Sequence, residues 1–283
     1  VYDDESQKYS YAKAPSSLVD PTSGVLDVLD SLSINFEDIE RFVHGVTIGT
    51  NTILQGKGAV VWMLTTRGFR DVLEIARTNR PILYDIKSLK LKPLIPRTRT
   101  FEISERMRYD GSVESAIELE DVDRAMQNIP DDDEVAVAIC FLHSYANPTH
   151  EIEAKQLCEK LRPDLFVCNS HEVLSQFREY ERFSTTALNA ILGPLMSQYF
   201  GHLKASLAER GYRHDIYIMT SNGGVSTVER AKELPISTVL SGPAGGVAAA
   251  VYLGKRHNLP NLITCDMGGT STDVCLVEDL RIP

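Results

Sequence analysis

The sequence lacks the features that mark nucleic-acid-binding and membrane-spanning proteins. Basic residues are few: 29 lysines and arginines stand against 39 aspartates and glutamates, which gives the 283 residues a net charge of −10. Such an acidic chain has no broad electrostatic attraction for nucleic acid or for an anionic membrane surface. No apolar run reaches the roughly 20 residues that span a bilayer. We therefore expect neither nucleic acid nor membrane among its partners.

Closely spaced cysteine pairs are also missing. The five cysteines contain no C-x-x-C spacing, which argues against a zinc site. Most of them lie in apolar or amphipathic segments, where a thiol behaves as a small hydrophobic group. We expect buried thiols in a reducing, cytoplasmic protein. The cysteines are Cys140, Cys158, Cys168, Cys265 and Cys275.

The sequence is otherwise that of a globular protein with alternating strands and helices. Hydrophobic residues make up 43% and charged residues 24% of the chain. Apolar runs of strand length alternate with helical segments, which favours an α/β fold. We expect strands over 41–49, 59–66, 100–108, 134–142, 165–169 and 215–220. Helices are expected over 20–32, 50–55, 71–76, 119–128, 147–161 and 179–210, the last interrupted near Gly193-Pro194.

The most informative segment lies near the C-terminus, at residues 264–274. Apolar runs flank the sequence Asp-Met-Gly-Gly-Thr-Ser-Thr-Asp, which reads as strand, tight turn and strand. Glycines allow close backbone approach to a ligand, and successive N–H groups in such a turn form an anion-binding nest. Asp266 could hold Mg²⁺ through water, and Asp273 could do the same or could pin the turn. An ordinary Gly-Gly hairpin is the alternative.

A helix rich in small residues is expected just before this hairpin, over residues 241–254. Ser241 and Pro243 open it and Gly254 lies near its end. Small residues let a helix pack closely on a neighbouring element or on a nucleotide, although a plain buried helix has the same composition. The helix and the D-x-G-G-T hairpin together resemble the crossing helix and second phosphate loop of the actin-like ATPase and sugar-kinase superfamily.

Further motifs narrow the resemblance to one family. They lie in register over nearly the whole chain, and together they closely resemble the ATP-dependent hydantoinase A/oxoprolinase family. That family includes N-methylhydantoinases, 5-oxoprolinases and subunits of acetone and acetophenone carboxylases. The segment from Asn79 to Asp85 is more similar to the hydantoinase branch. The motifs are 44–54, 64–75, Asn79-Arg80-Pro81 with Tyr84-Asp85, Glu105-Arg106 with Asp110-Gly111, 178–186 and 221–224.

One departure from the family pattern affects the expected domains. Family members begin with a first phosphate loop, also of D-x-G-G-T type, whereas here Val1 to Ser6 resembles the turn just after that loop. No D-x-G-G-T precedes Asp266. We expect residues 1–240 to form the first lobe without its first phosphate loop. Residues 241–283 would hold the crossing helix and the opening hairpin of the second lobe, so that the chain resembles a fragment of a two-lobed enzyme.

The resemblance implies ATP and Mg²⁺ as cofactors and assigns roles to particular residues. Asp266 would bind Mg²⁺. Thr47 and Asn51 would contact substrate or phosphate. His44 could hold a phosphate, polarise a carbonyl or be a structural histidine, and Thr50 could belong to the site or be a helix N-cap. Phosphate contacts would come from Gly268, Gly269, Thr270 and Thr272, and the cleft would be lined by Asn222, Gly223, Gly242 and Gly245.

Two arginines have two possible roles. Arg178 and Arg182 lie at the start of the expected long helix. They could clamp a phosphate bidentately, or they could belong to an ordinary salt-bridged helix end.

The implied activity is ATP-dependent opening of a cyclic amide or imide, such as a hydantoin or oxoproline, through a phosphorylated intermediate. A ketone carboxylase subunit is the alternative, as is a non-catalytic fragment of either enzyme. The resemblance also implies a hydantoinase B-like partner subunit or domain. A homo-oligomer is left open.

Overall fold

The chain forms two compact units that are described separately. We analysed a computed structural model, which describes residues 1–15, 21–79, 82, 84–85, 87–90, 92–131, 134–267 and 272–282. One unit comprises residues 1–47, 196–232 and 237–283, and the other comprises 48–195 and 233–236. Within the described residues, no helix is both long enough and apolar enough to cross a bilayer.

The unit of residues 48–195 is built on a parallel sheet of four strands in the order β5-β4-β8-β9. All three pairings in this sheet are parallel, so the carboxyl ends of the four strands lie at one edge. Every residue of the central strand β8 is buried, as expected for a strand covered on both faces. The strands are β4 (Val60–Thr66), β5 (Thr100–Ile103), β8 (Val135–Cys140) and β9 (Phe166–Asn169).

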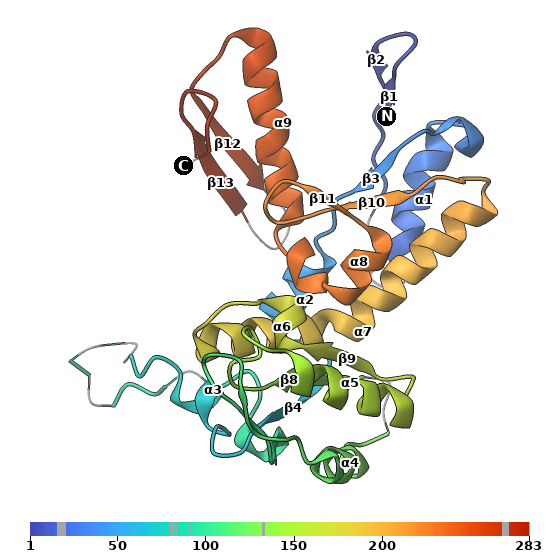
Figure 1. Cartoon of the computed structure of the whole chain (residues 1–283). Coiled ribbons are helices and arrows are strands. Elements are labelled where there is room, and N and C mark those ends of the chain that lie inside the picture. Colours follow the sequence, from blue (N-terminus) through green and yellow to red (C-terminus); the bar gives the residue numbers. More distant parts are fainter. Residues whose placement is uncertain are drawn as a thin grey trace. The chain divides into compact units, whose positions relative to one another are not determined.

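Helices cover both faces of this sheet, which confirms the predicted α/β class (Figure 1). One core cluster joins β8 side chains such as Val137 and Ile139 to the faces of α4 (Leu119–Gln127) and α5 (Thr149–Leu161). The cluster on the other face contains Phe183 and Ala187 of the long helix α7 (Glu179–Glu209). Shorter elements complete the unit: α2 (Ile48–Gln55), α3 (Val72–Ile75), β6 (Arg106–Met107), β7 (Val113–Ser115) and α6 (Ser170–Val173).

Two of the expected elements differ from the structure. The predicted strand over 100–108 is divided into β5, which pairs with β4, and β6, which pairs with β7. The predicted interruption of the long helix is absent, since α7 continues through Pro194. Tertiary packing overrides the proline: Leu192 and Met196 on either side are wholly buried. Gly193 lets the helix approach the ring of Phe166, where an added Cβ would lie 2.3 Å from ring carbons.

The other unit holds a three-stranded sheet in the order β11-β10-β3. β3 and β10 are parallel, and β11 joins β10 through a hairpin. The predicted strand over 41–49 is shorter in the structure, because pairing with β10 covers only Phe42–His44 and α2 already begins at Ile48. The elements are β1 (Tyr2–Asp3), β2 (Lys8–Tyr9), α1 (Pro21–Ser31), β3 (Phe42–His44), β10 (Ile216–Met219), β11 (Val225–Thr227) and α8 (Val228–Glu233).

The C-terminal part of this unit is a helix lying along a two-stranded hairpin (Figure 1). The helix α9 (Ser241–His257) is three residues longer than predicted. It packs on β12 (Leu262–Met267), which pairs antiparallel with β13 (Thr272–Val277). The predicted order of small-residue helix, short connection and hairpin is confirmed. The turn residues Gly268 to Ser271 lie outside the described residues.

Cysteine burial agrees in part with the sequence prediction. Cys140, Cys158 and Cys168 are buried free thiols, whereas Cys265 is exposed and Cys275 is intermediate. Burial raises the pKa of Cys158 and of Cys168 to about 12, so these thiols remain protonated and unreactive. They are packing groups of the core.

Candidate functional site

The candidate site begins where two parallel strands of the smaller sheet end. β3 and β10 are neighbours, with Ile218 beside His44. Ligands of open α/β sheets tend to bind at the carboxyl ends of such strands. The segment 45–47 follows β3, and the segment 220–224 follows β10.

The N-terminus of α9 is fastened to the segment after β3. The hydroxyl of Ser241, which is wholly buried, accepts a hydrogen bond from the Val46 N–H (3.3 Å) and donates one to the Val46 carbonyl oxygen (3.1 Å). A Cβ on Gly242 would lie 3.2 Å from Cγ2 of Thr47. The structure therefore brings together two predicted site residues, Thr47 and Gly242, that are almost 200 positions apart.

Gly245 packs against the other strand, β10. A Cβ at this position would lie 2.9 Å from Sδ of Met219, the last residue of that strand. The first turn of α9 thus crosses both strand ends at close range, and glycine is the residue that permits it. The N-terminus of an α-helix carries a positive dipole and N–H groups without intrahelical partners, which suits an anion.

Asn222 and Gly223 form a defined turn after β10. The Asn222 side-chain oxygen accepts hydrogen bonds from the Gly224 N–H (3.0 Å) and the Thr220 hydroxyl (2.6 Å). Gly223 has φ +80°, a left-handed conformation that favours glycine. The Ser221 N–H donates to the Ser237 carbonyl, 2.7 Å away. Residues 220–224 therefore form a turn, and Asn222 and Gly223 are exposed at the strand end.

His44 has the structural role that the sequence analysis left open. Its Nε2 lies 2.7 Å from the hydroxyl of Tyr199, a nearly buried residue of α7. Desolvation lowers the pKa of His44 to about 4, so the imidazole is neutral near pH 7. A neutral ring already bonded to tyrosine fixes the strand end and brings no positive charge to it.

The hairpin places the two acidic residues of the motif opposite each other. Asp266 on β12 pairs with Asp273 on β13, and Met267 pairs with Thr272. Like charges directly opposite on an antiparallel pair destabilise it, which a cation near both carboxylates would offset. Carboxylate oxygens are the ligands that Mg²⁺ prefers. Within the described part of the chain, no three or more acidic, histidine or cysteine side chains are grouped to hold a metal ion, so a cation here would need water or phosphate oxygens as well.

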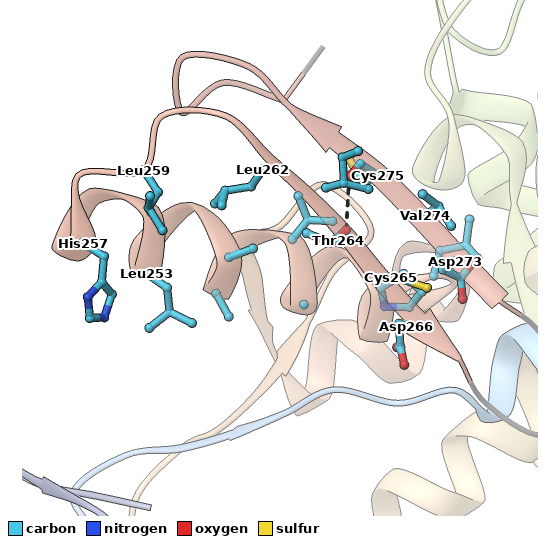
Figure 2. Close-up of a pocket in the computed structure, with 18 residues that line it drawn as sticks. Leu253, His257, Leu259, Leu262, Thr264, Cys265, Asp266, Asp273, Val274 and Cys275 are labelled. Atoms are coloured by element: carbon cyan, nitrogen blue, oxygen red, sulfur yellow. Dashed lines mark hydrogen bonds between the residues drawn. The ribbon is translucent and has the colours of Figure 1, made fainter.

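A cavity of about 610 Å³ lies between α9 and the hairpin. Figure 2 shows Asp266, Cys265 and Asp273 at one end of it and His257 and Leu259 at the other. Its walls are mostly apolar or small side chains from the helix and the two strands. The two carboxylates therefore lie at the end of an apolar groove.

The remaining predicted residues belong to other parts of the chain or lie outside the described residues. Asn51 lies in α2, which belongs to the other compact unit. Gly268, Gly269 and Thr270 lie outside the described residues. Arg178 is exposed, with its guanidinium 5.5 Å from the centre of the Phe177 ring.

Arg182 is an interior residue, which corrects both alternatives, the phosphate clamp and the salt-bridged helix end. It is wholly buried and donates to the Ser170 hydroxyl and to the carbonyls of Gln176 and Phe141, at 2.9–3.1 Å. All three nitrogen atoms of its guanidinium therefore donate to groups within the unit of residues 48–195.

Sequence reasoning missed a buried polar layer at the carboxyl edge of the four-stranded sheet. The Glu105 carboxylate accepts hydrogen bonds from the Thr66 hydroxyl and from Nδ1 of His150 (2.8 Å). Beside it, the wholly buried Glu151 accepts from the Phe141 N–H and the Ser170 hydroxyl. Glu151 also accepts from the N–H and Nδ1 of His171. Glu105 was noted within a motif, but pairs separated by tens of residues leave no local signal.

Comparison with known proteins identifies the family. The description "Hydantoinase/oxoprolinase N-terminal region" fits residues 1–162, and "Hydantoinase/oxoprolinase" fits residues 182–282. The chain is 36% identical over 273 residues to an uncharacterised protein of Methanocaldococcus jannaschii. It is 33% identical over 279 residues to caprolactamase subunit alpha of Pseudomonas jessenii. Each match covers 95% of this chain and 40% of the relative.

Two solved structures share the fold. Nucleotide-free acetone carboxylase superposes with a TM-score of 0.83 at 26% identity, covering 95% of this chain and 40% of that one. The ATP-dependent caprolactamase of Pseudomonas jessenii superposes with a TM-score of 0.82 at 32% identity, covering 98% and 41%. The chain thus spans about 40% of the length of these relatives. The resemblance inferred from the motifs is confirmed: the chain belongs to the hydantoinase/oxoprolinase family.

Proposed function

We propose that this chain belongs to an ATP-dependent enzyme that opens a cyclic amide or imide through a phosphorylated intermediate. The observation that carries the proposal is the close crossing of α9 over the ends of β3 and β10. Gly242 and Gly245 permit that approach, and the Asp266–Asp273 hairpin follows. Similar proteins support the reaction class, since they include caprolactamase subunit alpha and 5-oxoprolinase.

The residues present fit a magnesium nucleotide. Helix N–H groups and glycine-lined strand ends suit phosphate oxygens, and the opposed carboxylates suit a divalent cation. When bound, ATP would supply the phosphoryl group that activates the amide carbonyl oxygen, with Mg²⁺ offsetting its charge. Asp266 would hold the cation, and Gly268, Gly269, Thr270 and Thr272 would contact phosphate. Asn222, Gly223, Gly242 and Gly245 would line the cleft.

The remaining roles extend the same proposal. Thr47 and Asn51 would contact substrate or phosphate. Residues 1–240 would belong to a first lobe, with the crossing helix and hairpin of a second lobe in 241–283. A hydantoinase B-like partner subunit or domain, a cytoplasmic location and a possible homo-oligomer complete the proposal. Similar proteins named as subunits support a partner, among them acetophenone carboxylase gamma subunit and acetone carboxylase beta subunit.

The first test is stabilisation of the chain by nucleotide. Mg-ATP at 100 times its Kd would stabilise the folded state by about 2.7 kcal/mol, which appears as a higher melting temperature. Asp266→Asn should abolish the magnesium-dependent part of this rise. Glu278→Gln removes another exposed carboxylate just beyond the hairpin and should leave the rise intact. No rise with the unaltered chain would favour the non-catalytic alternative for it.

The second test separates the two reaction classes. Phosphate release from ATP is measured with hydantoin, 5-oxoproline or caprolactam, and in parallel with acetone or acetophenone with and without bicarbonate. Stimulation by a cyclic amide with ring-opened product supports the hydrolase. Bicarbonate-dependent stimulation by a ketone would replace it with the carboxylase, which the acetone carboxylase structure makes the specific alternative.

A further inference from the structure

The carboxyl edge of the β5-β4-β8-β9 sheet carries two histidines held in the same way. Nδ1 of His150 lies 2.8 Å from a carboxylate oxygen of Glu105, and Nδ1 of His171 lies 2.8 Å from one of Glu151. Both carboxylates are nearly or wholly buried. An ionised carboxylate can only accept, so Nδ1 carries the proton in each pair. In the neutral ring, the lone pair is then on Nε2.

The two pairs differ in how many hydrogen bonds their carboxylates accept. Glu151 accepts from four donors, and Ser170, one of the four, also accepts a hydrogen bond from the buried Arg182. The Glu151–His171 pair therefore belongs to an interior hydrogen-bond network that also contains the positive charge of Arg182. Among the described residues, Glu105 accepts only from Thr66 and His150 and forms no ion pair with an arginine or lysine.

His150 is oriented by rigid surroundings. Thr66, the last residue of β4, donates to Glu105 and accepts from the Leu142 N–H at 2.9 Å. His150 itself lies in the first turn of α5 and is 5% exposed. Within the described part of the chain, Nε2 of His150 has no hydrogen-bond partner. This atom nevertheless keeps some contact with solvent. A lone pair is thus held in a fixed direction at the sheet edge where α/β proteins bind ligands.

We propose that His150 is a ligand-contacting residue whose Nε2 accepts the ring N–H of a cyclic amide. The choice of ligand class rests on the proposed function. A carboxylate-held imidazole is a directional acceptor for an N–H group, and a buried acceptor gains more from such a bond than an exposed one. Glu105 and Thr66 are positioning residues that act through the ring of His150.

The test combines a variant with a matched ligand. His150→Asn places an amide N–H₂ where Nδ1 stood, which preserves the bond to Glu105, and it removes Nε2. N-methyl-caprolactam lacks the ring N–H that caprolactam has. The unaltered chain should bind caprolactam about 3- to 10-fold more tightly than its N-methyl form, the range expected for one hydrogen bond. His150→Asn should bind the two ligands equally, as measured by calorimetry or ligand-observed NMR.

A control and a spectroscopic readout separate contact from structure. His171→Asn makes the same change at the Glu151–His171 pair and should keep the preference for caprolactam. In the ¹⁵N-histidine-labelled chain, caprolactam should shift the Nε2 resonance of His150 and leave that of His171 in place.

Three results would overturn the inference. They are an unmoved His150 resonance when lactam is bound, a preference that survives in His150→Asn, and no lactam binding by the folded chain at millimolar concentration. The proposed function is judged independently, by stabilisation with Mg-ATP and by amide-stimulated phosphate release.

Discussion

Replacing Glu151 with glutamine should be among the most damaging conservative changes in the chain. The carboxylate is wholly buried, and each of its two oxygens accepts two hydrogen bonds. A glutamine keeps the shape but turns an N–H₂ group toward one of these pairs of donors. It also removes the negative charge that offsets Arg182, a wholly buried cation linked to Glu151 through Ser170.

The expected loss follows from both effects. Breaking a buried charge pair by removing one partner costs about 3–5 kcal/mol, because the other charge stays buried without compensation. Folded domains have only about 5–15 kcal/mol of stability, so this is a large fraction of it. With an m-value of about 2 kcal/mol/M in urea, the unfolding midpoint should fall by about 2 M.

The assay is urea unfolding followed by far-ultraviolet circular dichroism. Glu172→Gln is the matched control, since Glu172 pairs with Lys155 at 2.7 Å but its side chain is 39% exposed. An exposed pair of this kind contributes about 1 kcal/mol or less. The double variant Glu151→Gln/Arg182→Met should lose less than the sum of its two single changes. Equal, small losses in Glu151→Gln and Glu172→Gln would refute the assignment of a buried charge network.

Two further predictions concern His44 and the glycines of α9. The pKa of His44 is about 4 in the folded state, below its unfolded value near 6.5. The contribution of the neutral imidazole to folding stability is therefore complete above pH 6.5 and is lost as pH falls toward 4. The loss of folding stability reaches at most about 2 kcal/mol at pH 5. Because the ring is only partly buried, we expect a smaller loss. His44→Gln should flatten this slope in thermal melts at pH 4–7. Gly246→Ala, where a Cβ meets nothing within 4 Å, should stabilise α9 by about 0.5–1 kcal/mol. Gly254→Ala should destabilise it by about 1–3 kcal/mol, because its Cβ would lie 2.8 Å from the Leu259 carbonyl oxygen; equal melting temperatures for the two variants would contradict this packing.

Sequence patterns were informative wherever the physics is local. The paired strands β12 and β13, the small-residue helix and the apolar run of β8 each depend on local sequence, and all three are present. The start of α5 is local too: the side-chain oxygen of Asn147 accepts a hydrogen bond from the N–H of Thr149, the first residue of that helix. Pro194 was misjudged because the packing that overrides a helix breaker comes from residues distant in sequence.

The candidate site shows the same difference between what local sequence predicts and what only the fold reveals. Gly242 and Gly245 could be chosen from the sequence as permitting close approach, but only the fold identifies what approaches them: Thr47 and Met219. Arg182 has the same side chain whether it clamps a phosphate or compensates Glu151, and burial decides between these roles. His150 is a clearer example, because its neighbours Thr149 and Glu151 do not indicate that its partner is Glu105, 45 residues away. A histidine becomes a directed acceptor when a hydrogen bond from its other ring nitrogen fixes the ring, as the Glu105 carboxylate does here. Histidine–carboxylate pairs of this kind therefore have to be identified from the structure, at the ends of the strands, where the fold brings distant residues together.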